Sequence, residues 1–296
     1  MRRKYRIRGW LSAAGFLLSV TCSAQYTPTA TEKVDRVAKA GIYRIVLPPP
    51  LVASCGNDLS DLRILDEYGK EAPYVLKTDI HDPLNAGFLP IPDPIIRQQD
   101  SSDRHSYYWL KYDDRYRIDR LSLVITRPAL YKRTAVVSTV FDQGTAIPAV
   151  TISIDPGDSV FEVPSLNANL LMIDIANHDN APLTIERVAT AQSGIYLLAY
   201  LEPDHEYELA VDYKVGLPDY DLRYFTDNMR LTPVTIGLGP LHRLSVLEGI
   251  KLNQAIRNRR SSRKSELLLW GAVAVILLLL LYVSVKLARA VDKKGI

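Results

Sequence analysis

The chain has 296 residues and a formal net charge of +3, with 36 lysines and arginines against 33 aspartates and glutamates. Basic residues gather at the two ends, so the segment 25–256 keeps 22 basic and 31 acidic residues and a net charge near −9. Such an acidic segment argues against nucleic acid as a partner, because nucleic-acid binding needs a basic surface.

The first predicted element is an export signal over residues 1–24. Five basic residues among the first eight are followed by a mostly apolar stretch, Gly9–Val20, and by small residues up to Ala24. This order is typical of a secretory signal peptide, and the apolar stretch is too short to span a membrane. We expect cleavage between Ala24 and Gln25. Lipidation of Cys22 is the alternative, although the residues before it fit a lipoprotein signal poorly.

A small N-terminal β-domain is expected over residues 25–114. Apolar and polar residues alternate in short runs bounded by turn residues, which indicates β-strands with one buried face. The proline-rich stretch from Asp79 to Asp103 carries few strand signals and is predicted to be a long loop. The expected strands are Ile42–Leu47, Leu62–Leu65, Pro73–Leu76 and Tyr107–Tyr112.

A second β-domain is expected over residues 115–225. Short strands recur there every eight to twelve residues, which is typical of a β-sandwich or jelly roll. The fold class is therefore predicted to be all-β, with a β-sandwich or jelly-roll ectodomain of two β-domains. The expected strands are Tyr116–Ile125, Ala135–Phe141, Val150–Ile154, Val160–Val163, Leu170–Ala176, Leu183–Ala189, Ile195–Tyr200 and Tyr207–Tyr213.

The C-terminal part is predicted to anchor the protein. A stalk is expected over residues 226–266, where prolines and glycines interrupt the strand pattern. The next nineteen residues, Leu267–Val285, carry no charge, and as a helix they would be about 28 Å long, which matches the hydrocarbon core of a bilayer. Trp270 and Tyr282, near the two ends, suit the headgroup layers. Residues 286–296 would form a short tail.

Basic residues flank the predicted span almost equally, five before it and four after it, so charge alone does not orient it. The export signal decides the orientation, because it carries the segment 25–266 across the membrane and leaves the tail in the cytoplasm. We therefore expect a single-pass membrane protein that contacts membrane lipid through Leu267–Val285.

Common catalytic motifs are absent from the sequence. It holds no GxSxG, HExxH, glycine-rich phosphate loop or paired-cysteine motif, and its five histidines show no ligand spacing. Cys55 is the single cysteine after signal cleavage, which excludes an intramolecular disulfide. The pairs Asp58/Asp61 and Asp113–Asp114 could serve glycoside hydrolysis, but exposed acidic pairs are the simpler interpretation. We expect no enzymatic activity and no obligatory cofactor.

Calcium is the one metal that the sequence suggests. Asn177, Asp179 and Asn180 supply hard oxygen ligands between two predicted strands, where jelly rolls often bind calcium. The same residue types also form turns at strand ends, and a calcium ion needs six to eight converging oxygens. The turn is therefore the simpler interpretation of these residues.

The strand Tyr107–Tyr112 is rich in aromatic residues. Tyr107, Trp109 and Tyr112 could form a platform on which sugar rings stack. The alternative is that alternate members of the run fill the core while the others cover the outer face of the strand. We favour the second interpretation, since strands commonly use aromatic residues in this way.

Two groups of segments carry a resemblance to a known family. Leu59–Asp66 is followed by Gly69 and by Ala72–Leu76, and Asn180–Leu183 is followed by Pro218–Leu222. These segments resemble motifs of the bacterial envelope family catalogued as domain of unknown function 3999, which shares the export signal, two β-domains and one C-terminal span. The resemblance implies a membrane-anchored periplasmic protein with a galactose-binding-like jelly roll as its second domain. It implies no activity and no catalytic residues.

The first functional hypothesis is a non-enzymatic, membrane-anchored cell-envelope protein. Its β-sandwich ectodomain would be a binding or scaffolding module for another envelope protein. The alternative is a carbohydrate-binding module for envelope glycans, which rests on the jelly-roll pattern and the aromatic run. A hydrolase that uses surface carboxylates is a third and less favoured hypothesis. The expected location is the bacterial inner membrane, with the ectodomain in the periplasm and the C-terminus in the cytoplasm.

Overall fold

The computed structural model describes residues 27–292, with gaps at 80, 83, 142–143, 213–215 and 227–232. Side chains at 260, 262–269 and 283–292 also fall outside the description. The predicted export signal, residues 1–24, therefore lies outside the described residues.

The described chain is mostly β-structure. The strands are β1 (Ala30–Lys33), β2 (Gly41–Val46), β3 (Arg63–Asp66), β4 (Tyr74–Lys77), β5 (Phe88–Pro90), β6 (Ile95–Asp100), β7 (His105–Arg127), β8 (Arg133–Val140), β9 (Ala146–Ile154), β10 (Val160–Ala176), β11 (Thr184–Ser193), β12 (Tyr196–Leu201), β13 (Tyr207–Val211), β14 (Val234–Ile236) and β15 (His242–Arg243). The helices are α1 (Pro49–Ser54), α2 (Leu222–Thr226) and α3 (Val246–Asp292).

Domain 1 consists of the described residues 27–77 and 195–243 and contains two four-stranded sheets. Sheet 1 has the order β15-β1-β13-β3, and sheet 2 has the order β14-β2-β12-β4. One apolar core lies between them, with Ile64 and Leu209 from sheet 1 and Ile45 and Leu197 from sheet 2 all fully buried. Both sheets combine strands from the two ends of the described chain, so domain 1 is discontinuous in sequence.

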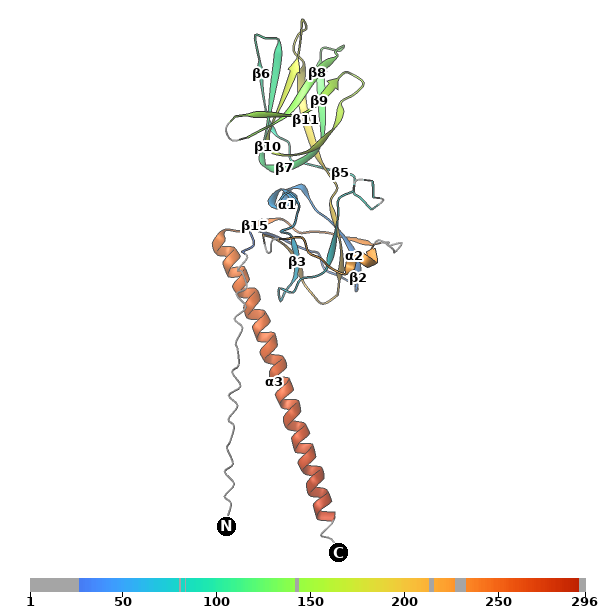
Figure 1. Ribbon diagram of the computed structural model, residues 1–296, viewed down its shortest axis with the longest axis vertical. Helices are drawn as coiled ribbons and strands as arrows, with labels where there is room; N and C mark the ends of the chain where they lie inside the picture. The colour runs from blue at the N-terminus through green and yellow to red at the C-terminus, as the bar shows by residue number, and fades with distance from the viewer. Residues whose placement is uncertain are drawn as a thin grey trace, which may run out of the picture.

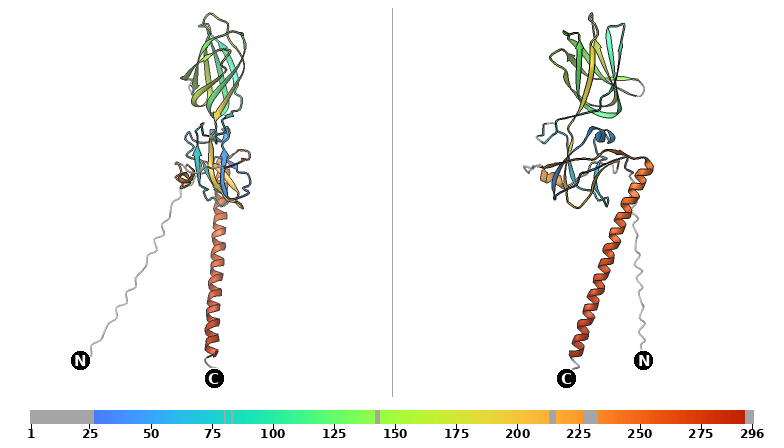
Figure 2. Two further views of the ribbon diagram at one scale, coloured as in Figure 1. Left: turned by 90° about the vertical axis from the view of Figure 1, so that its right-hand side faces the viewer. Right: turned by 180° about the vertical axis from the view of Figure 1, so that it is seen from behind.

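Domain 2 consists of residues 88–193 and contains sheet 3, which has seven strands. Its order is β5-β11-β7-β10-β8-β9, and β6 pairs with β7 beside this path. All of these pairings are antiparallel. The sheet curls around a second apolar core that includes Leu110, Ile118 and Ile173. Domain 2 lies at one end of the molecule, domain 1 lies in the middle, and α3 extends away beyond domain 1 (Figure 1; Figure 2).

The division of the chain differs from the predicted one. The predicted boundary at residue 114 falls inside β7, because the two expected strands on either side of it form one bent strand of 23 residues. Bulges in the pairing of β10 with β7, between Glu162 and Leu166 and between Ala168 and Leu170, accommodate the bend. The last two strands expected in the second domain, now β12 and β13, belong to sheets 2 and 1 of domain 1.

Two segments predicted to lack strands contain them. The predicted loop from Asp79 to Asp103 holds β5 and β6, and β5 lies at the edge of sheet 3, where proline is tolerated. The predicted stalk over residues 226–266 holds β14, which pairs with β2, and β15, which pairs with β1. These short strands complete both sheets of domain 1, so the stalk begins only at α3.

Helix α3 begins at a capping box. The amide of Ser245 donates to Glu248 Oε2 at 2.8 Å, and the amide of Glu248 donates to Ser245 Oγ at 3.4 Å. The predicted span Leu267–Val285 lies along the backbone of α3, and its side chains at 267–269 and 283–285 are not among the described ones. Among the described residues, no helix meets the length and apolarity needed to cross a membrane.

Candidate functional site

The aromatic run of β7 is divided between the two faces of sheet 3. Successive side chains of a strand point to opposite faces, so Tyr108, Leu110 and Tyr112 point into the core of domain 2 and are at most 4% exposed. Tyr107 and Trp109 lie on the other face and are half-buried. Tyr112 therefore does not belong to a surface platform, and the burial follows the favoured interpretation, in which alternate members of the run fill the core.

The buried tyrosines have partners inside domain 2. The hydroxyl of Tyr112 donates to Thr190 Oγ1 at 3.1 Å, and the hydroxyl of Tyr108 donates to the carbonyl of Leu183. Burial raises the pKa of Tyr108 to about 12 and that of Tyr112 further still. These side chains hold the core together and keep β7 fixed beneath its outer face.

Neighbouring strands surround Tyr107 and Trp109 with polar groups. In the register of β6 with β7, Arg97 lies opposite Trp109 and Gln99 lies opposite Tyr107. On the other side, Asp174 of β10 lies opposite Tyr107. Residues directly opposite each other share a face of the sheet. Six residues therefore form one surface, called the aromatic face from here on: Arg97, Gln99, His105, Tyr107, Trp109 and Asp174.

An ionisable pair stands at one end of the aromatic face. His105 Nδ1 lies 2.6 Å from Asp174 Oδ1, and the imidazole stacks on Tyr107 with a centroid distance of 6.1 Å. The hydrogen bond to Asp174, together with the charges of Asp174 and Asp103, raises the pKa of His105 above its ordinary value. The face thus offers two aromatic rings beside hydrogen-bonding groups, which suits a polar ligand with an apolar side.

Most residues of the aromatic face could not be predicted from the sequence, because they lie far apart along the chain. His105 and Asp174 are 69 positions apart, and only the pairing of β7 with β10 brings them together. Arg97 and Gln99 lie in the stretch predicted to be a loop. Strand alternation was the one available signal, since it separates positions 107 and 109 from position 112.

The predicted calcium residues make separate contacts in the turn after β10. Asn177 is 3% exposed and its amide Nδ2 donates to Ser106 Oγ at 2.8 Å. Asp179 forms an ion pair with Arg104. Asn180 Nδ2 donates to the backbone carbonyl of Asn177 at 3.2 Å. These contacts are those of a strand-ending turn.

The predicted carboxylate pairs also have structural partners. Asp61 is buried and both of its oxygens accept from the amide of Gly56, at 3.0 and 3.1 Å. Asp58 is exposed and accepts from the amide of Ser60 at 3.1 Å. Asp114 forms an ion pair with Arg243 of β15. Asp58 and Asp61 thus serve the turn after α1, and Asp114 serves the contact between domains.

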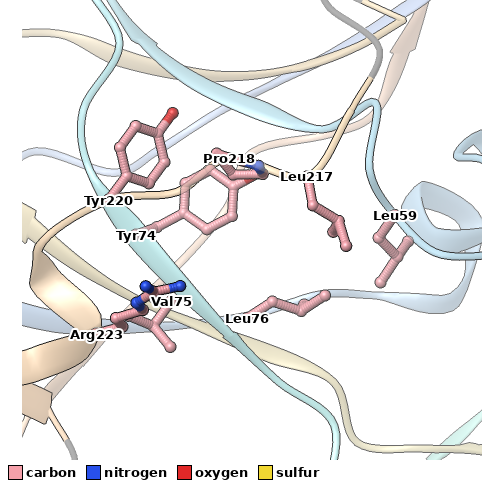
Figure 3. A pocket seen from close by; sticks show the side chains of 8 residues that line it. All are labelled: Leu59, Tyr74, Val75, Leu76, Leu217, Pro218, Tyr220 and Arg223. Carbon is pink, nitrogen blue, oxygen red and sulfur yellow. The ribbon is translucent and has the colours of Figure 1, made fainter.

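A small cavity in domain 1 lies beside the segment that follows β13 (Figure 3). The rings of Tyr74 and Tyr220 meet edge to face at a centroid distance of 5.4 Å, and Leu217 lies near the other end of the cavity. The volume is about 120 Å³. Ligand pockets typically measure roughly 300–1,000 Å³, so this cavity is too small for a typical ligand.

No protein-family model and no curated protein matches this chain. Two solved structures are similar to parts of it. A rhamnosidase from Novosphingobium sp. PP1Y has 10% identity and a TM-score of 0.22, over 65% of this chain and 26% of the rhamnosidase. Tailspike protein 4 of bacteriophage CBA120, in its enzymatically active domain, has 11% identity and a TM-score of 0.12, over 54% of this chain and 20% of that one. The chain spans about a quarter of the rhamnosidase.

Proposed function

We propose that this protein is a non-enzymatic, single-pass membrane protein of the bacterial envelope that displays domain 2 as a binding module. The observation that carries the proposal is the position of the aromatic face: Tyr107 and Trp109 lie half-buried on the outer face of sheet 3. Sheet 3 belongs to domain 2, which lies farthest from α3 (Figure 1). A binding surface held away from an anchoring helix is accessible to partners within the envelope.

The exposed part of α3 supports the membrane anchor. Every side chain from Trp270 to Tyr282 is exposed, and none of these residues is charged. An exposed apolar stretch of this kind is unfavourable in water and favourable in lipid. In this proposal lipid covers the stretch, the two β-domains lie in the periplasm, and the C-terminus lies in the cytoplasm.

Another envelope protein is the partner that we propose first. Aromatic residues and arginine are enriched at protein interfaces, and Trp109 and Arg97 lie opposite each other on the aromatic face. A glycan is the second candidate, because Tyr107 and Trp109 can stack against sugar rings while Asp174 and Gln99 supply hydrogen bonds. The assignment of domain 2 to the galactose-binding-like jelly rolls belongs to this proposal and is supported by its fully antiparallel pairing.

Membership of the family of domain of unknown function 3999 remains part of the proposal. Two of the segments that carry the resemblance meet in domain 1, where the hydroxyl of Tyr220 donates to Glu71 Oε2 at 2.7 Å and the ring of Tyr220 contacts Tyr74. Arg63, which belongs to the first of these segments, donates to the carbonyl of Gly216, just before the second. These segments therefore pack together at one corner of domain 1.

The test compares variants of the full-length protein in native membranes. We expect Tyr107→Ala with Trp109→Ala to lower co-purification of crosslinked envelope proteins, or sedimentation with isolated envelope glycan, at least about fivefold, because the stacking surface is lost. Val124→Ala is the matched control, since Val124 is an exposed apolar residue of the same strand. Unchanged recovery of every partner in the double variant would contradict the proposed site.

A further inference from the structure

Two turns of domain 1 meet at one edge of sheet 1. The pairing of β3 with β13 places Asp66 opposite Tyr207, and this register brings the turn after β3 beside the turn before β13. The first turn carries Asp66 and Glu67, and the second carries His205. Nδ1 of His205 lies 3.0 and 3.2 Å from the two carboxylate oxygens of Glu67. One ligand atom from each of the three residues lies within 4.8 Å of the others.

We infer that Asp66, Glu67 and His205 form a binding site for a divalent transition-metal ion of the zinc type. One imidazole nitrogen with two carboxylate oxygens is a ligand set that zinc accepts at tetrahedral sites. Calcium and magnesium are less suited, because they favour all-oxygen coordination. Three protein ligands leave the fourth zinc position open to water or to a bound molecule.

The ligands are held in place by the backbone around them. Asp66 Oδ1 accepts from the amides of Tyr68 and Lys70 at 2.9 and 2.8 Å, and Glu67 Oε2 accepts from the amide of Glu206 at 3.3 Å. Such outer hydrogen bonds orient metal ligands and are part of most metal sites. The side chains of Glu67 and His205 are 18% and 26% exposed, so they are partly shielded and still reachable.

A polar cavity of about 330 Å³ adjoins two of the three residues. Asp66 and His205 line it, together with Lys70, Glu71 and Glu202. Carboxylates outnumber cationic groups along this wall, and an excess of negative charge attracts cations. The cavity gives a metal ion an entry path and gives its open coordination position space for a ligand.

The competing interpretation is that His205 and Glu67 form only an ion pair between the two turns. The two interpretations differ in what they expect of added zinc: three converging ligands bind it, whereas an ion pair alone does not. A zinc titration therefore separates them directly.

The test uses the full-length protein in detergent, without a histidine tag and freed of metal by chelation. Zinc is titrated against a chromophoric chelator, and Co²⁺ is added separately to read the visible absorption of tetrahedral coordination. We expect one high-affinity equivalent, weakened more than about tenfold in His205→Ala and in Glu67→Gln. His242→Ala is the matched control, because His242 is an exposed histidine elsewhere in domain 1 and its loss should leave the affinity unchanged.

Melting curves of each variant without metal test whether the fold is intact. Zinc should raise the melting temperature of the wild type and leave those of His205→Ala and Glu67→Gln unchanged. Zinc binding that is unchanged in both site variants would overturn the inference. The inference would also be overturned if the wild type bound no more zinc than His205→Ala does, because His205 and Glu67 would then form an ion pair only.

Discussion

At the scale of single residues, domain 1 buries two charged side chains in different ways. Arg63 is 1% exposed and donates to the carbonyls of Ser60, Leu62 and Gly216, so its charge is surrounded by acceptors. Glu32 is 4% exposed, and its Oε2 has no hydrogen-bond partner among the described residues. Burial without that partner raises the pKa of Glu32 to about 7, from an ordinary value of 4.5.

The raised pKa predicts how Glu32 changes stability with pH. Below pH 4.5 the carboxyl is protonated in both the folded and the unfolded chain, so its contribution is fully retained. As the pH rises towards 7, the unfolded chain releases this proton more readily than the folded chain does. The free energy of unfolding therefore falls by up to about 3 kcal/mol, at 1.36 kcal/mol per pKa unit. Glu32→Gln should remove this loss.

Urea denaturation of the fragment 25–256 between pH 4 and pH 8 measures the difference between Glu32→Gln and the wild type. The advantage of the variant should grow as the pH rises. Glu162→Gln serves as the control, because the side chain of Glu162 is 75% exposed and should give a nearly constant difference. A constant difference for Glu32→Gln as well would mean that this carboxyl ionises freely in the folded state.

At the scale of elements, the two chain crossings between the domains are tied to each other. The amide of Gly194 donates to the carbonyl of Gly87 at 2.6 Å, and Asn85 Nδ2 donates to the carbonyl of Gly194 at 2.7 Å. Helix α1 adds a further contact, since its Leu51 lies in the core of domain 1 while Ala53 packs against the core of domain 2. The junction is therefore a close-packed joint.

A side chain at Gly194 should loosen this joint. A Cβ there would collide with the side-chain oxygen of Asn85 and lie 2.9 Å from the backbone carbonyl of Gly87. We expect Gly194→Ala to cost about 1–3 kcal/mol of unfolding free energy and to expose the crossings to protease, because the neighbouring backbone must shift. Gly41→Ala is the control, since nothing lies within 4 Å of a Cβ at Gly41. Equal protease resistance in the two variants would contradict the expected strain.

At the scale of the whole molecule, domain 1 lies between domain 2 and α3 (Figure 1). Gly249 of α3 lies against Thr27 and Pro28, and Ile256 lies against Gly69. The φ of Gly69 is +72°, a backbone conformation that favours glycine, and the side chain of Ile256 occupies the space that a Cβ would need. The helix is thus seated on domain 1 over its first turns and extends freely beyond them (Figure 1).

This arrangement makes a prediction about membrane topology. Protease added to the outer side of the inner membrane should degrade both β-domains and spare a tag placed after Ile296, because the proposed span leaves only the tail on the inner side. Immunoblots of spheroplasts with and without permeabilisation measure both fates, and a cytoplasmic marker protein controls for leakage. A tag that is digested in intact spheroplasts would reverse the proposed orientation.

Local sequence pattern predicted the strands far better than their partners. Alternation located β2, β3 and β4 to within a residue or two, since a strand with one buried face must alternate. The pairing of β3 with β13 could not be predicted, because it depends on contacts about 145 positions apart that leave no local trace. Prolines concealed β5 because an edge strand tolerates residues that a central strand excludes.

The candidate site shows the same limit. The alternation of side chains along β7 places Tyr107 and Trp109 on one face of the strand and Tyr112 on the other. This rule alone is enough to remove Tyr112 from the platform. The partners of the aromatic face, His105 with Asp174 and Arg97 with Trp109, follow from cross-strand register alone. Register depends on the packing of the whole sheet, so a single sequence does not reveal it.

The insertion of domain 2 into domain 1 sets an order in which the chain can fold as it emerges from its N-terminus onwards. Every strand of sheet 3 has been made once Ser193 emerges, whereas the described partners of β1, β2, β3 and β4 all follow that residue. The hydroxyl of Thr29, for example, donates a hydrogen bond to Asp212 Oδ2, which is 183 positions later in the chain. The four early strands therefore wait with unpaired edges until the later strands follow. Domain 2 is thus completed first, and domain 1 closes around its base afterwards.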